Sequence, residues 1–140
     1  MSVQTILLPL FVEVILTFAL LFWLAPLRAR DFRSGLVREE DIGLRQPNWS
    51  KPALQVQYSF SNQFELPVLF YVLTILAYVT HHAGTLFVVL AWVFVIFRAL
   101  QAYVHVTNNK VRLRGAFFGV SALALAIMWI VFIIQILTGT

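Results

Sequence analysis

The sequence predicts an all-α integral membrane protein, a bundle of four membrane-spanning helices. Of its 140 residues, 61% are hydrophobic and only 11% are charged, and the mean hydropathy is +0.86. An ordinary soluble domain carries roughly 25% charged residues. Four stretches approach the ~20 consecutive apolar residues that a helix needs to cross a bilayer. We therefore expect residues 1–140 to form a single transmembrane domain.

The four predicted spans are residues 5–27, 54–80, 83–107 and 115–137. The first has neither a basic segment before it nor a small-residue cleavage site after it, so we interpret it as a retained helix rather than a signal peptide. Only the short sequence "HHAG" links the second and third spans, which predicts a tight antiparallel hairpin. The first connection, residues 28–53, is mixed in charge and rich in Gly and Pro, which predicts a loop.

The basic residues predict the orientation in the membrane. They gather around the first and third connections, whereas the termini and the second connection have none: Arg28, Arg30, Arg33, Arg38, Arg45, Lys51, Arg98, Lys110, Arg112 and Arg114. By the positive-inside rule, these two connections lie in the cytoplasm and both termini lie outside. We expect a bacterial inner membrane protein with periplasmic termini. The net charge of +4 reflects this topology, and no motif predicts a nucleic-acid partner.

The chain contains no cysteine, so any sulfur chemistry needs a thiol from a substrate. Adjacent histidines, His81 and His82, lie in the predicted hairpin, but no further ligand supports them. We therefore expect no metal site.

Polar side chains gather where the second span begins and the third ends. Tyr58, Asn62 and Glu65 share a face of the second span, because they are four and three residues apart. Arg98, Gln101 and His105 likewise share a face of the third span at the same depth. One interpretation is a wet pocket in which Arg98 pairs with Glu65. The other is a structural clamp, with Arg98 extending toward the interface.

Glu13 lies well inside the first span, where a carboxylate must be paired or protonated. A structural hydrogen bond and a proton-relay role are both compatible with its position.

Three motifs, taken together, resemble the MAPEG family, the membrane-associated proteins in eicosanoid and glutathione metabolism. They are "NQFELPVLF" (62–70), "FRALQAYVH" (97–105) and "VRLRGAFFG" (111–119). Their order and spacing, the four spans and the long basic first loop all resemble the family, over nearly the whole chain.

The resemblance implies a homotrimer that binds glutathione, as a co-substrate, between neighbouring subunits near the cytoplasmic side. It implies that Asn62 and Glu65 hold the tripeptide, that Tyr103 lies beside it, and that Arg112 stabilises its thiolate, with Arg114 and Lys110 as alternatives to Arg112. Arg30, Arg98 and Tyr58 complete the candidate glutathione-binding residues.

The implied reaction is attack of an activated thiolate on a lipophilic electrophile that arrives through the membrane. The sequence departs from glutathione-conjugating relatives in having Tyr58 where they have arginine, Leu66 where some have tyrosine, and Gln101 where many bacterial members have histidine. Two functions therefore stay open. One is a microsomal-type glutathione S-transferase or peroxidase of lipophilic substrates. The other is a non-catalytic membrane protein of this fold that binds a lipid or a membrane-protein partner.

Overall fold

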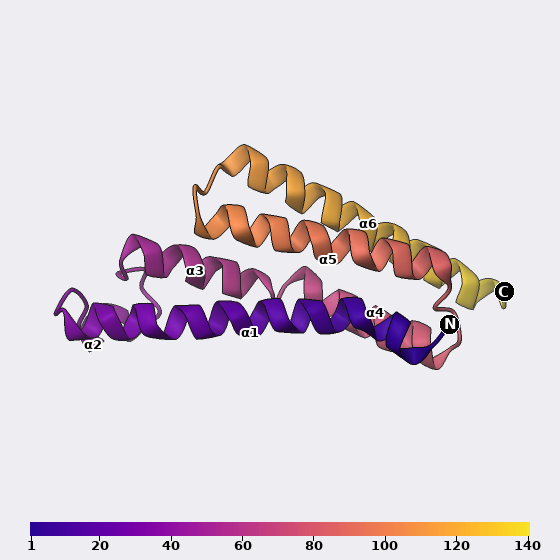
Figure 1. Ribbon diagram of the computed structural model, residues 1–140, viewed down its shortest axis with the longest axis horizontal. Coiled ribbons are helices and arrows are strands. Elements are labelled where there is room, and N and C mark those ends of the chain that lie inside the picture. Colours follow the sequence, from indigo (N-terminus) through magenta and orange to yellow (C-terminus); the bar gives the residue numbers. More distant parts are fainter.

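The chain forms four long helical rods. They run side by side and alternate in direction, as Figure 1 shows. The computed structural model describes all of residues 1–140 and contains helices and no strand. The helices are α1 (Val3–Arg33), α2 (Glu39–Ile42), α3 (Lys51–Asn62), α4 (Leu66–Val79), α5 (Thr85–Val106) and α6 (Val111–Thr138). Helices α3 and α4 follow one another and together make the second rod. This architecture confirms the predicted four-helix transmembrane fold.

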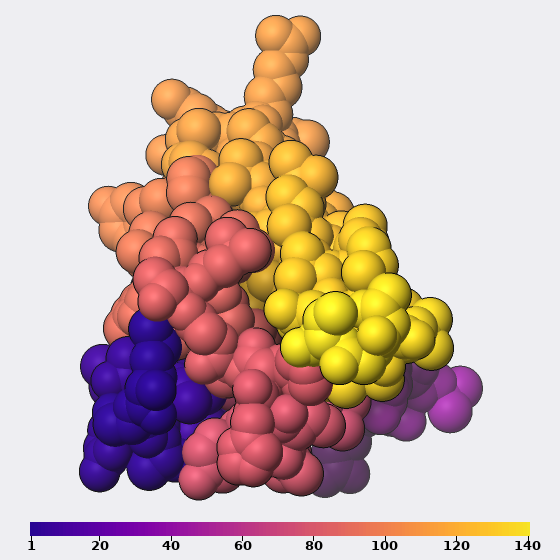
Figure 2. All heavy atoms as spheres, turned by 90° about the vertical axis from the view of Figure 1, so that its right-hand side faces the viewer, coloured from indigo at the N-terminus to yellow at the C-terminus, as the bar shows by residue number.

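The two ends of the bundle differ in character. Both termini and the α4–α5 turn lie at one end, which we call the terminal end; Figure 2 looks onto it and shows the N-terminal, hairpin and C-terminal residues side by side. The other end, the loop end, carries residues 34–50 and the α5–α6 turn. The four rods are long and apolar enough to cross a membrane, and the chain is an integral membrane protein by this criterion.

The first helix is longer than the apolar run that predicted it. Helix α1 continues to Arg33, so Arg28 and Arg30 belong to the helix and not to the loop. Basic side chains in a last turn interact favourably with the negative end of the helix dipole, which allows the helix to extend past the apolar segment. The predicted loop is thereby shortened, and it also contains the short helix α2.

The second span is interrupted inside the bundle, which the sequence analysis did not predict. Helix α3 ends at Asn62 and α4 begins at Leu66, with a turn at residues 63–65. Pro67 has no backbone N–H and cannot donate to the carbonyl of Gln63, which favours an interruption here. A proline at the second position of a new helix is well tolerated, and α4 starts in this way.

All four carbonyls at the end of α3 have donors, which is required where no water is available. The side-chain Nε2 of Gln63 donates to the Ser59 carbonyl at 2.8 Å. Backbone N–H groups of residues 63, 64 and 65 donate to the carbonyls of Phe60, Ser61 and Asn62 at 3.0, 3.0 and 3.3 Å. The interruption is therefore an ordered turn.

The core lies between α4, α5 and α6, with α1 packed against one side. Phe70 of α4 and Phe94 of α5 are fully buried and stack with their ring centroids 4.8 Å apart. Large apolar side chains cover the outside of every rod, among them Ile15, Phe22, Leu123 and Ile134. Such an exterior suits contact with lipid, where association depends on packing rather than on removal of apolar surface from water.

Candidate functional site

A pocket opens at the loop end between α3, α5 and α6, and we call it the loop-end pocket. Its volume is about 470 Å³, within the roughly 300–1,000 Å³ of small-molecule sites. The residues that line it come from three helices: Tyr58, Ser61 and Asn62 of α3, Gln101 and His105 of α5, and Val111, Arg114, Gly115 and Phe118 of α6.

Several polar groups that line this pocket have no partner within the chain. The side-chain Oε1 of Gln101 and the ring Nδ1 of His105 are buried and make no hydrogen bond. These two residues are four apart on α5 and therefore share a face. Burying an unpaired polar group costs roughly 1–3 kcal/mol. Both residues line the pocket, but these two atoms are themselves buried, so a polar ligand would reach them only after the side chains turn.

Arg114 brings a positive charge to the same pocket. Its Nη1 donates a hydrogen bond of 2.8 Å to Oδ1 of Asn109, in the α5–α6 turn. Asn109 has φ 53°, in the left-handed region that asparagine adopts more readily than most residues. The turn thus fixes one side of the guanidinium and leaves its other donors available.

Arg98 lies behind the pocket and does not line it. Its guanidinium is 1% exposed, and its Nη2 donates a hydrogen bond of 2.8 Å to the backbone carbonyl of Asn62. It forms no ion pair with Glu65; the only ion pair in the chain joins Arg38 and Glu40 at 3.6 Å. Arg98 caps the end of α3 instead, so the expected pairing with Glu65 is not what the structure contains.

The shared face predicted for Tyr58, Asn62 and Glu65 is interrupted by the turn. Tyr58 and Asn62 remain on α3 and both line the loop-end pocket. Glu65 follows the end of α3, with φ −101° and ψ −106°, and its side chain is exposed. The spacing argument fails for Glu65 because it assumed that the helix continues past Asn62, where α3 ends.

Three further candidates from the sequence lie outside this pocket. Tyr103 is 66% exposed on α5, and Arg112 at the start of α6 and Arg30 near the end of α1 are also exposed. Their predicted roles toward glutathione stay predictions. In a single chain, none of the three contacts the cavity that Asn62 lines.

The structure points to His105 and Arg114 where the sequence analysis preferred Tyr103 and Arg112. Helical spacing indicates His105 rather than Tyr103, because residues 98, 101 and 105 share a face of α5 and residue 103 is turned away from it. Helical spacing also groups Arg114 with Phe118, since the two are four residues apart on one face of α6 and both line the pocket.

A second cavity of about 410 Å³ lies on another side of α3, between α1 and the first connection. Arg28 donates to Oε1 of Gln57 at 2.6 Å and lies over the ring of Trp49, 4.8 Å from its centroid. Ser61 lines both this cavity, which we call the α1–α3 cavity, and the loop-end pocket. Arg45 and the apolar Leu21, Leu24, Ile42 and Phe60 complete its lining.

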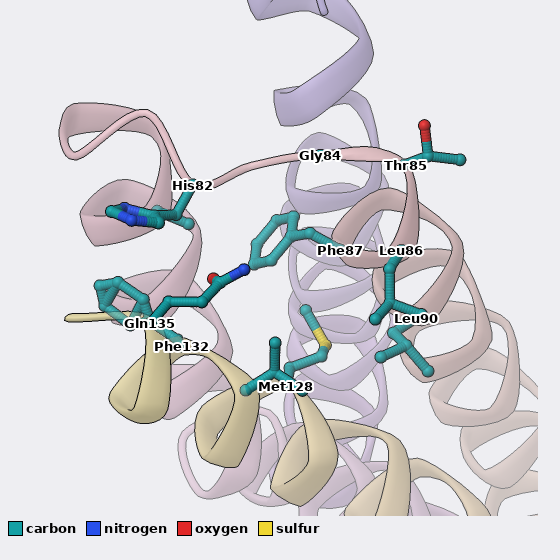
Figure 3. Close-up of a pocket in the computed structure, with 11 residues that line it drawn as sticks. His82, Gly84, Thr85, Leu86, Phe87, Leu90, Met128, Phe132 and Gln135 are labelled. Carbon is teal, nitrogen blue, oxygen red and sulfur yellow. The ribbon is translucent and has the colours of Figure 1, made fainter. Parts of the chain in front are cut away.

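A third cavity, of about 200 Å³, lies at the terminal end between the α4–α5 hairpin and α6. Figure 3 shows that Phe87, Leu90, Met128 and Phe132 surround it, with His82 and Gln135 at one side. We call it the terminal-end cavity. It is separated from the loop-end pocket by the length of the bundle, and its lining is mostly apolar.

No group of three or more metal-ligating side chains occurs in the structure.

Comparison with known proteins identifies the family. The sequence profile described as "MAPEG family" matches residues 6–134, which is nearly the whole chain. Searches of the curated proteins and of the solved structures matched nothing. The profile extends over all four membrane-spanning rods and over every residue of the loop-end pocket. The chain belongs to the MAPEG family.

Proposed function

We propose that the protein is a glutathione-dependent transferase or peroxidase-like enzyme that acts on lipophilic electrophiles, and that the loop-end pocket holds glutathione. The observation that carries this proposal is the convergence of the Arg114 guanidinium with the unpartnered Gln101 and His105 in one cavity. Membership of a family that includes glutathione transferases supports it.

The residues present fit glutathione in kind. The tripeptide carries two carboxylates, an amino group, amides and a thiol, and the pocket offers a guanidinium, two carboxamides, an imidazole and two hydroxyl groups. The cavity of about 470 Å³ is of the size that such ligands occupy. The chain supplies no cysteine of its own, so the thiol has to come from this co-substrate.

Glutathione would supply the sulfur nucleophile. Arg114 would lie near the thiol and favour its ionised form, because a nearby cation stabilises a thiolate. Asn62 would orient the peptide by its side-chain amide, while its backbone is held by Arg98. Phe118 and Val111 would exclude water from the sulfur and provide an apolar side toward the membrane.

We also propose a homotrimer in which glutathione is held between subunits. Three candidate residues are exposed in the single chain and lie outside its loop-end pocket: Glu65, Arg30 and Arg112. In a trimer, they could contact glutathione that is bound in the pocket of a neighbouring subunit. The gathering of basic residues at the loop end supports a cytoplasmic location for this end and an outer location for the termini.

The test is a glutathione titration of the purified protein, followed by the ultraviolet absorbance of the thiolate. We expect thiolate formation with the unaltered protein and its loss in Arg114→Ala. Arg112→Ala is the matched control, because it removes the same side chain two residues away and outside the pocket. Loss of the signal in Arg112→Ala alone would instead assign the thiolate to Arg112. Absence of both a thiolate signal and thermal stabilisation at millimolar glutathione would refute the enzymatic proposal.

A second candidate function is lipid binding without catalysis. The apolar terminal-end cavity supports it, since a lipid chain or a small lipophile would fill the space between Phe87, Met128 and Phe132 (Figure 3). Native mass spectrometry of the purified protein distinguishes the two functions: a lipid retained without any glutathione binding favours this second candidate.

A further inference from the structure

The proposed reaction makes no use of Glu13, although it is the only acidic residue in the apolar part of α1. Its side chain is 0% exposed, and neither carboxylate oxygen has a hydrogen-bond partner. An ionisable side chain at membrane depth is expensive and is retained where it performs a task.

Glu13 and Arg98 lie at similar depth from the terminal end, ten residues after the start of α1 and thirteen after the start of α5, and these two helices pack together. They form no direct ion pair, so the attraction between them acts across a gap. Glu65, in the turn at residues 63–65, also attracts Arg98 without forming an ion pair with it. The Nε of Arg98 is also without a partner.

Arg98 in turn fixes the end of α3 through the 2.8 Å hydrogen bond to the Asn62 carbonyl. This carbonyl otherwise receives only the N–H of Glu65, at 3.3 Å. The side chain of the same residue lines the loop-end pocket. The position of a pocket residue thus depends on a buried cation.

We infer that Glu13 is a positioning residue of the loop-end pocket, which acts by holding the Arg98 guanidinium against the end of α3 and so fixing the turn at residues 63–65. Removing one charge of a buried pair leaves the other uncompensated. Without Glu13, the Arg98 side chain moves toward Glu65 and the wetter loop end, as long basic side chains do in membranes. The Asn62 carbonyl then loses its shorter hydrogen bond, and the turn loosens.

The absence of cysteine allows a direct test with one nitroxide label. The label is attached to a cysteine introduced by Phe64→Cys, in the turn, where the Phe64 side chain is 59% exposed. Leu123→Cys, on the outside of α6, is the matched control site, because Leu123 is 63% exposed. We expect Glu13→Gln to increase label mobility at position 64 and to leave it unchanged at position 123. Glu13→Asp keeps the charge, and because the attraction acts without direct contact, we expect it to retain the parent spectrum.

A double-mutant cycle tests whether Glu13 acts through Arg98. In an Arg98→Met background, adding Glu13→Gln should cause no further change at position 64. Four results overturn the inference: an unchanged label at position 64 in Glu13→Gln, equal loosening at both positions, Asp behaving like Gln, or a further effect in the Arg98→Met background.

Where Glu13→Gln does not fold, the double variant Glu13→Leu Arg98→Met replaces it. Both buried charges are then removed together, which folded proteins tolerate better than removal of one. In this double variant, we expect the label at position 64 to be more mobile than in the parent. A label as immobile as in the parent overturns the inference.

The consequence for glutathione rests on the proposed function. If the unaltered protein binds glutathione, we expect Glu13→Gln to weaken binding roughly tenfold, the effect of one hydrogen bond to a charged group. The label measurements need no ligand. A mobile turn in Glu13→Gln, together with no glutathione binding by the unaltered protein, therefore supports the positioning role and refutes the proposed function separately.

Discussion

Asn109 and Arg114 are joined across the α5–α6 turn by a hydrogen bond of 2.8 Å, in which the guanidinium Nη1 donates to the side-chain Oδ1. The backbone N–H of Asn109 donates to the Val104 carbonyl at 2.7 Å, so the turn is fixed to the end of α5. Through this pair, the conformation of a short connection determines the direction of the cation in the loop-end pocket.

We expect Asn109→Gly to weaken glutathione binding and thiolate formation roughly five- to tenfold, because it removes the acceptor that orients Arg114. Glycine adopts positive φ without strain, so the turn itself is retained. Isothermal titration and thiolate absorbance measure the effect. Asn109→Asp keeps the acceptor and should bind as the unaltered protein does; equal loss in both variants would mean that the hydrogen bond is not the cause.

Tyr58→Arg should strengthen glutathione binding. Tyr58 lines the loop-end pocket, so an arginine there would bring a second guanidinium to the proposed ligand. A charge-assisted hydrogen bond to a carboxylate contributes roughly 1.5–3 kcal/mol, and partial exposure reduces this, so we expect about a tenfold gain. The gain should decrease as salt is added.

Tyr103→Arg is the control for this gain. It makes the same substitution at an exposed site outside the pocket, and it adds the same charge to the protein. An equal gain in Tyr103→Arg would show that general charge attraction, and not the pocket, is responsible.

Gln101 and Gln57 should differ in how the same substitution, to leucine, changes the free energy of unfolding. Gln101→Leu removes an unpartnered buried acceptor and should leave the free energy of unfolding unchanged or raise it by up to about 1 kcal/mol. Gln57→Leu removes the acceptor of the 2.6 Å bond from Arg28 and should lower it by about 1 kcal/mol. Thermal unfolding in one detergent compares the two.

The same Gln101→Leu protein should bind glutathione more weakly, because it loses a polar group that lines the pocket. Retained affinity would remove Gln101 from the proposed site even if the stability result is as expected.

Leu90→Trp tests the terminal-end cavity. A larger side chain there should displace a lipid bound near Phe87 and Met128, and it should change glutathione affinity by less than about twofold, since the cavities lie at opposite ends of the bundle. Native mass spectrometry and titration provide the two measurements. Leu100→Trp, at an exposed position of the same helix, is the control for a general effect of tryptophan.

The sequence was sufficient to predict the number of spans, their order and the hairpin, because each follows from local runs of apolar residues and from turn composition. The end of α3 was not predicted, although Pro67 was visible, because a proline does not by itself end a helix: Pro9 and Pro26 lie inside the continuous α1. The partner of Arg98 required the tertiary structure, since a backbone carbonyl leaves no mark in a sequence.

The site residues show the same limit. Asn62 and Tyr58 are four residues apart on one helix, and both line the loop-end pocket. Arg114 was separated from Arg112 only when the start of α6 was known, because a shift of two residues on a helix turns a side chain by about 200° and moves it from a cavity to the exterior.

Ser61, on α3, lines both the loop-end pocket and the α1–α3 cavity. This one helix therefore separates two spaces of about 470 and 410 Å³. A sideways shift of α3 that widens one space narrows the other. The two spaces therefore compete for volume, and a bulky residue at position 61 would reduce both at once.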